Sequence, residues 1–415
     1  MPVKNGWTGG QYSLFRAAFG LYLALHFMQL IPWGAELFSS AGALSQSTLS
    51  PLAALFPNVL VLFDAPWQVA SLLGAAAAAA LLFAAGLLDR AAAVFLWYVW
   101  ACLLGRNPLI ANPGIPYVGW LLLAHALLPG APYGSWGACS RSDPDGGWIM
   151  PQPILRAAWI LMALGYSYSG ITKLGSRSWA DGTAIYYVLE NPLARPGIVR
   201  DLLVSLPDPL LRAATWGALG LELLFVPLAL FRRLRPLLWS ALLAMHLVLL
   251  VLIDCTDLSL GMIVLHLFTF DPAWIPARPP RQPETLYYDG GCGLCHRAVR
   301  FALAEDRAAG LRFAPLQGEA FRAAVPPERR GLLPDSLVLS TEDGALLIRS
   351  EAVVRMLLRF GGVWRILGLL LRAVPTATRD AAYDLVARLR HRLFTPPAEA
   401  CPLIPERLRD RFMLT

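Results

Sequence analysis

Long apolar stretches alternate with short polar breaks over most of the chain, and this pattern ends after Trp274. A helix that crosses a bilayer needs about 20 mainly apolar residues, and by that length the pattern predicts about eight membrane-spanning helices. The apolar segment 49–63 is interrupted by two prolines, which favours a re-entrant or interfacial position over a span. The predicted spans cover approximately residues 12–32, 67–88, 91–106, 109–129, 153–172, 209–231, 236–253 and 257–272.

From Pro276 onward charged residues come every few positions, which is typical of a domain surrounded by water. Apolar residues after Cys295 recur at helical spacing, and residues 351–360 form a second predicted helix with Ser350 as its N-cap. Four short β-prone segments accompany the helices, so the pattern predicts a small α/β domain. The predicted strands are 285–288, 311–314, 336–340 and 345–348.

Prolines crowd the segment between the two parts of the chain. Proline removes backbone donors and favours extended backbone, so a linker is predicted at residues 276–283. The predicted domains are therefore a transmembrane domain at 1–275 and a soluble domain at 284–415.

The distribution of Lys and Arg between the loops predicts the orientation of the chain, because cytoplasmic loops are enriched in both. The 33–66 connection contains neither, whereas the 231–236 loop contains three arginines. With eight spans, both termini then lie in the cytoplasm, and the protein is expected to be integral to the inner cell membrane. The alternative for the first apolar stretch, which follows Lys4, is a cleaved signal peptide.

The composition and net charge of the chain indicate which kinds of partner it binds. Hydrophobic residues make up 56% of the 415 residues and charged residues only 15%, whereas soluble domains carry about 25% charged residues. The net charge of +7 fits basic cytoplasmic loops, and without clusters of basic and aromatic residues it does not indicate nucleic-acid binding. The expected partner is the lipid bilayer.

Of six cysteines only Cys292 and Cys295 are close in sequence, which is the spacing of a redox pair or of half a zinc site. No second pair follows, which disfavours zinc. Asp289 and two glycines turn the chain between a predicted strand and a predicted helix, so Cys292 is expected at the helix N-terminus. Free N–H groups there stabilise a thiolate, and Cys295 is placed to reach it. An inert structural pair is the remaining alternative.

Four other residues are candidates for supporting roles in this domain. Asp289 either orients the turn or takes part in proton transfer, and His296 either tunes the pair or is simply solvated. Pro334 is expected to be a cis-proline facing the cysteines or an ordinary loop proline. Cys401 is either a third redox thiol or a buried apolar residue.

The run Tyr287-Tyr-Asp289-Gly-Gly-Cys292-Gly-Leu-Cys295 resembles the Asp-Gly-x-Cys-x-x-Cys signature of the DCC family of thiol–disulfide oxidoreductases. Ser350-Glu-Ala-Val and Gly361-Gly-Val-Trp agree with it further, and the resemblance covers roughly residues 284–415. It implies a thioredoxin-like fold and thiol–disulfide exchange. The predicted fold class is thus an α-helical polytopic membrane domain followed by a small thioredoxin-like α/β domain.

The membrane domain carries a second resemblance. Lys173 is conspicuous because the chain has only one other lysine, Lys4, and the motif Tyr166-Ser-Tyr-Ser-Gly-Ile-Thr-Lys173-Leu resembles the HTTM family of vitamin K-dependent gamma-carboxylase-like membrane domains over roughly residues 10–275. In the carboxylase branch the matching lysine is the base that deprotonates vitamin K hydroquinone. The resemblance implies quinone or lipid binding near Lys173, and the alternative is an interfacial or salt-bridging lysine.

Ionisable residues within the predicted spans are costly in lipid and therefore mark polar sites. Glu222 requires a partner or a proton, and His246 or His266 is the expected partner. A structural polar network between helices is the alternative reading of all three.

Taken together, the sequence predicts a membrane-anchored thiol–disulfide oxidoreductase. Cys292 is the expected nucleophile toward a protein or small-molecule thiol or disulfide, Cys295 resolves the mixed disulfide, and the pair itself requires no cofactor or metal. In a reducing cytoplasm the expected direction is reduction of the partner. The alternatives are an enzyme acting on a quinone or lipid through Lys173, and a non-catalytic binding or transport module that senses redox state.

Overall fold

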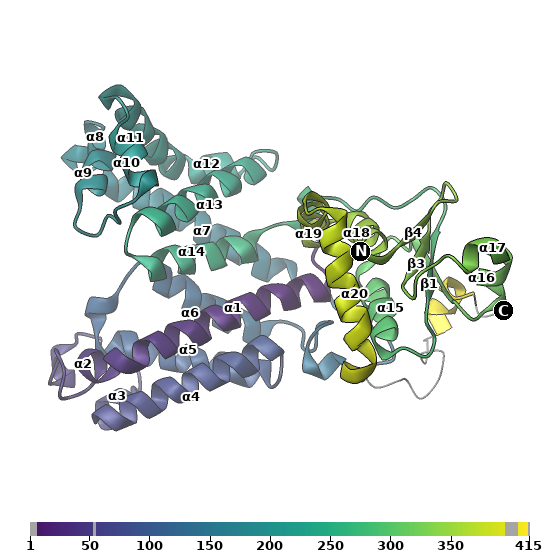
Figure 1. Cartoon of the computed structure of the whole chain (residues 1–415). Helices are drawn as coiled ribbons and strands as arrows, with labels where there is room; N and C mark the ends of the chain where they lie inside the picture. Colours follow the sequence, from purple (N-terminus) through teal and green to yellow (C-terminus); the bar gives the residue numbers. More distant parts are fainter. Residues whose placement is uncertain (1–5, 53–54, 395–405, 414–415) are drawn as a thin grey trace. The chain divides into compact units, whose positions relative to one another are not determined.

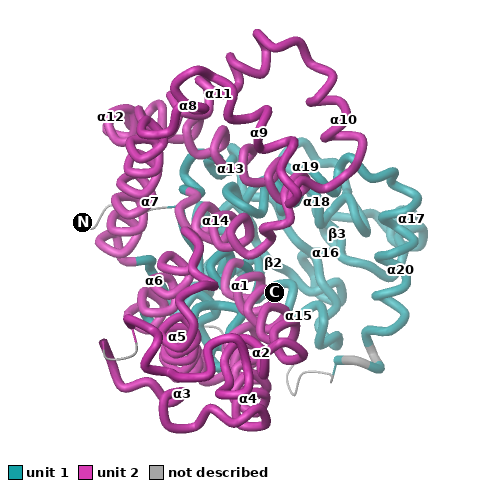
Figure 2. The backbone as a smooth tube through the Cα atoms, turned by 90° about the vertical axis from the view of Figure 1, so that its left-hand side faces the viewer, with its two compact units in different colours: residues 1–14, 129–150, 271–415 teal, residues 15–128, 151–270 magenta. Residues whose placement is uncertain are grey.

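The computed structural model describes residues 6–52, 55–394 and 406–413. The chain divides into two compact units, which Figure 2 colours separately. The first, here called the sheet unit, comprises Met1–Leu14, Pro129–Met150 and Asp271–Thr415. The second, here called the helical unit, comprises Phe15–Leu128 and Pro151–Phe270.

The helical unit consists of helices joined by turns and short connections (Figure 1). Each of the eight predicted spans overlaps a helix, and helix α1 begins within the sheet unit. The helices are α1 (Gly9–Leu30), α2 (Gly34–Phe38), α3 (Val59–Leu62), α4 (Pro66–Ala85), α5 (Asp89–Arg106), α6 (Gly114–Leu127), α7 (Gln152–Lys173), α8 (Arg177–Ala180), α9 (Ala184–Glu190), α10 (Ile198–Val204), α11 (Asp208–Leu223), α12 (Phe225–Ala229), α13 (Arg235–Leu252) and α14 (Thr256–Thr269).

Among the described residues, four helical stretches are long and apolar enough to cross a membrane. Helices α6 and α14 have 14 residues each, about 21 Å at 1.5 Å per residue, which is short of the roughly 30 Å hydrocarbon core. Several apolar helices thus support membrane association, whereas eight spans and the orientation of the termini stay predictions. The four stretches are Gly9–Phe38, Pro66–Ala85, Gln152–Lys173 and Arg235–Leu252.

The sheet unit is built on a four-stranded sheet in the order β2-β1-β3-β4. Strand β1 pairs in parallel with β2 and antiparallel with β3, and β4 is antiparallel to β3. All four strands were predicted from the sequence, with boundaries that differ by one or two residues at most. They are β1 (Glu284–Tyr288), β2 (Leu311–Pro315), β3 (Val338–Ser340) and β4 (Leu346–Ile348).

Helices cover both faces of this sheet because the strand residues alternate. Leu286 and Phe313 belong to a core with α15, α18 and Phe412, whereas Tyr287 packs against Phe321 on the opposite face. The helices after β1 are α15 (Gly293–Glu305), α16 (Glu319–Ala324), α17 (Pro327–Arg330), α18 (Arg349–Phe360), α19 (Gly362–Ala373) and α20 (Thr376–Leu393).

The sequence did not indicate that segments 6–14 and 129–150 fold with the C-terminal domain. Glu305, the last residue of α15, is only 1% exposed and accepts hydrogen bonds from Thr8 Oγ1, from the Gly10 N–H (2.9 Å) and from Trp364 Nε1. This one carboxyl group therefore joins the start of the chain, the end of α15 and the start of α19.

The predicted linker is hydrogen-bonded to the domain that follows it. The Arg278 N–H donates to the Arg359 carbonyl at 3.0 Å, and the Arg281 N–H donates to Glu342 Oε2 at 2.6 Å. Proline thus keeps this segment extended, and the Arg278 and Arg281 N–H groups find acceptors within the sheet unit.

Candidate redox site

The connection from β1 to α15 places Cys292 at the N-cap of the helix, as the sequence predicted. Its backbone is extended (φ −105°, ψ 117°), and its sulfur accepts the Cys295 N–H at 3.3 Å. An N-cap side chain that accepts a free helix N–H occupies the positive end of the helix dipole. A thiolate at this position is stabilised by the backbone itself, which is the requirement for a reactive cysteine.

Asp289 holds the turn that precedes the cysteines. Its Oδ1 accepts the Gly291 N–H at 3.0 Å and Gln317 Nε2 at 2.9 Å, and the Gly290 N–H in turn donates to Gln317 Oε1 at 3.3 Å. Of the two roles predicted for Asp289, these contacts support the one in which it orients the turn. Gln317 was not identified from the sequence, because it follows β2 and reaches this turn only through the parallel pairing of β1 with β2.

His296 is buried at 7% exposure, so the prediction that it is simply solvated is wrong. Its Nε2 lies 3.0 Å from the Gly290 carbonyl oxygen, and its ring meets Tyr288 edge-on. A carbonyl only accepts, so Nε2 carries the proton in this contact. His296 thus stabilises the turn from the side of the helix.

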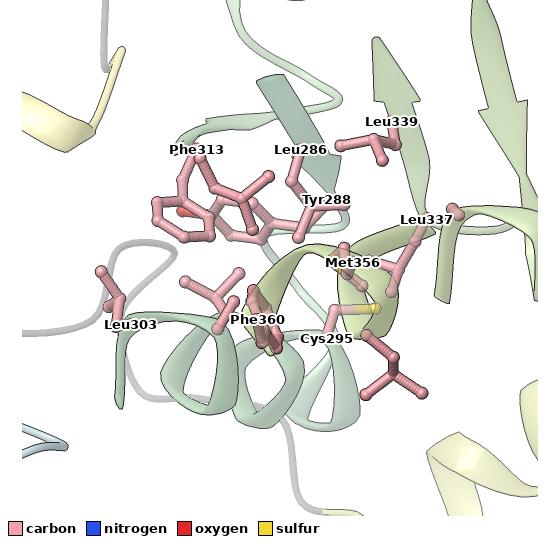
Figure 3. Close-up of a cluster of buried hydrophobic side chains, with 14 of the residues drawn as sticks. Leu286, Tyr288, Cys295, Leu303, Phe313, Leu337, Leu339, Met356 and Phe360 are labelled. Carbon is pink, nitrogen blue, oxygen red and sulfur yellow. The ribbon is translucent and has the colours of Figure 1, made fainter. Parts of the chain in front are cut away.

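Cys295 lies one helical turn after Cys292 and is buried at 6% exposure, beside Leu337 and Met356 in the core drawn in Figure 3. Burial raises the pKa of its thiol to about 12, and the hydrogen bond and charge of the neighbouring Cys292 act in the same direction. Cys295 therefore keeps its proton at neutral pH. The pair thus combines a sulfur that caps the helix with a sulfur that stays protonated, and these different surroundings suit the two roles in a dithiol couple.

Arg390 of α20 brings a positive charge to the two sulfurs, and the sequence did not reveal it. Its side chain is 5% exposed and pairs with Asp335 Oδ2 at 2.6 Å and with Asp289 Oδ2 at 3.7 Å. Burial opposes its charge, but the Asp335 hydrogen bond and the nearby Cys292 and Cys295 outweigh this and raise its pKa. Arg390 in turn acts to lower the pKa of Cys295, although burial outweighs this effect.

A pocket of about 490 Å³ opens beside Cys295. Alanine, valine and leucine side chains dominate its lining, and Cys292 is not among the lining residues. Tyr383 of α20 also lines the pocket, and its hydroxyl accepts the Leu337 N–H at 3.0 Å. A volume in this range suits a small ligand, so the exposed part of the couple faces an apolar space.

Two predictions for this domain are corrected, and one lies outside the described residues. No peptide bond is cis among the residues that the structure describes, so the cis alternative for Pro334 is wrong and the alternative of an ordinary loop proline holds. Ser350 is not the N-cap of α18, because the helix begins at Arg349 and the Ser350 hydroxyl donates to Asp380. Cys401 lies outside the described residues.

The polar candidates of the helical unit pair with one another. Lys173 Nζ lies 2.5 Å from both carboxylate oxygens of Glu222 and 4.6 Å from the centre of the Trp179 ring. The expectation that Glu222 pairs with His246 or His266 is therefore wrong, since both histidines contact the Tyr166 hydroxyl instead, at 2.8 and 3.4 Å. Lysine reaches Glu222 because Gly170 lets α7 approach α11 closely: a Cβ there would lie 2.7 Å from the Leu223 nitrogen.

The described part of the chain contains no group of three or more His, Cys, Asp and Glu side chains that could hold a metal ion. Both cysteines are free, and the Cys292 sulfur accepts the Cys295 N–H.

The strand, the turn and the N-capped cysteine pair define a thiol–disulfide oxidoreductase domain. A family model of DCC1-like thiol-disulfide oxidoreductases matches residues 286–396, and through this C-terminal domain the chain belongs to the DCC family.

Two curated proteins are similar to the same part of the chain. The uncharacterized protein YuxK of Bacillus subtilis is 31% identical over 132 residues, which cover 31% of this chain and 93% of YuxK. A chloroplastic DCC family protein of Arabidopsis thaliana is 32% identical over 111 residues, 26% of this chain and 63% of that protein. No solved structure matches the chain.

Proposed function

We propose that the protein is a membrane-anchored thiol–disulfide oxidoreductase that works through the Cys292/Cys295 couple. The observation that carries this proposal is the Cys292 sulfur, which caps α15 and accepts the Cys295 N–H at 3.3 Å. The family match supports the reaction class. The apolar helices of the chain support the anchoring.

The proposed reaction follows from the different surroundings of the two sulfurs. The Cys292 thiolate attacks one sulfur of a partner disulfide, a mixed disulfide forms, and the other partner sulfur leaves as a thiolate. Cys295 then loses its proton and attacks the Cys292 sulfur, which closes the internal disulfide and releases the second partner thiol. The high pKa of Cys295 keeps this thiol protonated until the mixed disulfide has formed.

The test is reduction of insulin disulfides by the full chain in detergent, with dithiothreitol as the electron source. The wild-type protein accelerates the reaction, whereas Cys292→Ser reduces the rate to that of dithiothreitol alone. Cys295→Ser accumulates a mixed disulfide at Cys292. Cys139→Ser is the matched control, because Cys139 is exposed but remote in sequence from the pair, and it keeps the wild-type rate. Equal rates for wild type and Cys292→Ser would refute the proposal.

A second candidate function is binding of a quinone or lipid in the helical unit, in keeping with the resemblance to HTTM domains. A cavity of about 1050 Å³ is lined by Thr172 and Leu223, the sequence neighbours of the Lys173–Glu222 ion pair. Under this proposal the purified protein carries a co-extracted quinone or lipid that Lys173→Ala loses. Organic extraction and mass spectrometry of both proteins test it, and an extract that is unchanged by the substitution contradicts it.

A further inference from the structure

Among the described residues, the pocket beside Cys295 offers a small molecule a route to the cysteine couple. Cys292 is only 1% exposed, and Cys295 is the sulfur that lines the cavity. The residues that line it come mainly from α15, α18, α20 and the end of α19. Any molecule that exchanges electrons with the couple through this opening therefore meets Cys295 first.

The charged residues in the lining are neutralised by carboxylates of the domain. Arg379 pairs with Glu351 at 2.6 Å, and Arg390 pairs with Asp335 at 2.6 Å. Both arginines are therefore paired already and cannot serve as counter-ions for a small thiol or disulfide that carries carboxylate groups. Burying the charges of such a ligand in the pocket would be costly. A peptide would bring N–H and C=O groups that the predominantly aliphatic lining cannot satisfy.

Apolar side chains also form the mouth of the pocket and continue beyond it. Leu371, Val374 and Val386 line the cavity although each is exposed to solvent. Leu370 and Leu385, on the same two helices, are exposed as well. Exposed apolar side chains around an opening suit a ligand that is itself apolar, and the chain carries helices able to cross a bilayer, where such ligands dissolve.

We propose that this pocket binds a neutral, lipid-soluble carrier of two electrons, of the quinone class, and that the carrier oxidises the cysteine couple. The inference rests on the proposed redox function of Cys292 and Cys295, and it identifies the small-molecule partner of that couple.

The step balances with one proton taken from water. The Cys292 thiolate and the Cys295 thiol give up two electrons and one proton, the S–H bond of Cys295 breaks, and an S–S bond forms between the sulfurs. The quinone accepts the two electrons, the proton of Cys295 and a second proton from water, and two O–H bonds form at its oxygens to give the hydroquinone. This direction is opposite to the reduction expected from a reducing cytoplasm, and it would let the resulting disulfide take electrons from a partner thiol.

Tyr383 is the polar group that orients the carrier. Its hydroxyl oxygen accepts the Leu337 N–H, so its own proton is available for a carbonyl oxygen of the quinone. In a pocket whose lining is mostly aliphatic and whose arginines are paired with carboxylates, this hydrogen bond fixes the orientation of the ligand.

The test uses the full chain in phospholipid nanodiscs, fully reduced and freed of reductant. It is mixed with a decyl-substituted benzoquinone, and both hydroquinone formation and loss of free thiols are followed. Ala382→Trp fills the pocket from α20, and Ala381→Trp is the matched control, because both alanines are exposed but only Ala382 lines the cavity. We expect the wild type and Ala381→Trp to react at similar rates, and Ala382→Trp at least tenfold more slowly.

A second pair of variants keeps the test valid if tryptophan disturbs the helix. Val386→Gln places an amide at the mouth, and Leu385→Gln places the same amide one residue earlier, at 51% and 52% exposure respectively. Only the first substitution is expected to slow the quinone reaction.

The outcomes separate this inference from the function on which it rests. Equal quinone rates in all variants, or no quinone reaction in a protein that still reduces insulin disulfides, would overturn the inference alone. A protein that reacts with neither the quinone nor insulin would overturn both.

Discussion

The two units bury their chemically active groups in opposite ways. In the helical unit the groups contact one another, since Lys173 pairs with Glu222 and the Tyr166 hydroxyl contacts His246 and His266. In the sheet unit the Cys292 sulfur depends on a backbone N–H, and Cys295 faces an apolar pocket. Polar groups that pair stabilise a structure, whereas a thiol that caps a helix keeps its reactivity, and its neighbour at the opening can be reached by a small molecule.

The greatest loss of stability is expected when the ion pair between Lys173 and Glu222 in the helical unit is broken. Lys173→Met leaves the Glu222 carboxylate buried without its counter-ion, and removing one partner of such a pair costs about 3 kcal/mol or more. The free energy of unfolding in detergent should fall accordingly, as measured by a thermal or denaturant series. Arg177→Met, an exposed arginine just beyond α7, is the control and should change stability little. Equal stability of both variants would show that the ion pair is not structural.

The next effect concerns Glu305, where burial raises the pKa from 4.5 to about 7. Between these values the folded protein holds a proton that the unfolded chain has released, so stability is full below pH 4.5 and is lost as the pH rises to 7. The loss is about 3 kcal/mol. Hydrogen exchange of α15 across this range should show it, and Glu305→Gln should remove the pH dependence. A wild-type profile that is flat with pH would contradict this assignment.

A smaller effect is expected from the positive charge beside the cysteine pair. Arg390→Gln removes the positive charge near both sulfurs, and a loss of about tenfold in the alkylation rate at neutral pH corresponds to about 1.4 kcal/mol. Arg388→Gln, on the exposed side of α20, should alkylate at the wild-type rate. If Arg390→Lys restores the rate, the charge is responsible; if Arg390→Gln alkylates normally, Arg390 does not act on the thiols.

The smallest effect tests whether His296 stabilises the turn or tunes the cysteines. His296→Ala removes the hydrogen bond to the Gly290 carbonyl and should lower the free energy of unfolding by about 1 kcal/mol. His296→Gln can still donate to this oxygen and should recover most of the loss. The dependence of the alkylation rate on pH should keep its shape in both variants, whereas a changed shape would favour the tuning role.

The sequence predicted the elements of the sheet unit well because its signals are local. Alternating strands, the Asp289-Gly-Gly turn and the helical spacing after Cys295 lie within a few residues of one another, and the N-cap position of Cys292 follows from them. Ser350 failed as an N-cap because the helix begins one residue earlier, at Arg349.

Contacts between distant parts of the chain could not be predicted in this way. Arg390, Tyr383 and Gln317 reach the redox site from elements that follow it by many residues, and Glu305 binds the start of the chain. In the helical unit the sequence singled out Glu222, His246 and His266 as polar residues within the spans but assigned Glu222 the wrong partner, because the partner depends on the close approach of α7 and α11 at Gly170.

The proposed redox function is tested most directly by asking whether the sulfurs of Cys292 and Cys295 form a disulfide in the oxidised protein. The full chain is equilibrated in a glutathione redox buffer, free thiols are alkylated, and the peptides are identified by mass spectrometry. We expect a disulfide between Cys292 and Cys295 that opens and closes reversibly with the buffer potential. Recovery of both residues as alkylated free thiols at every potential would contradict it.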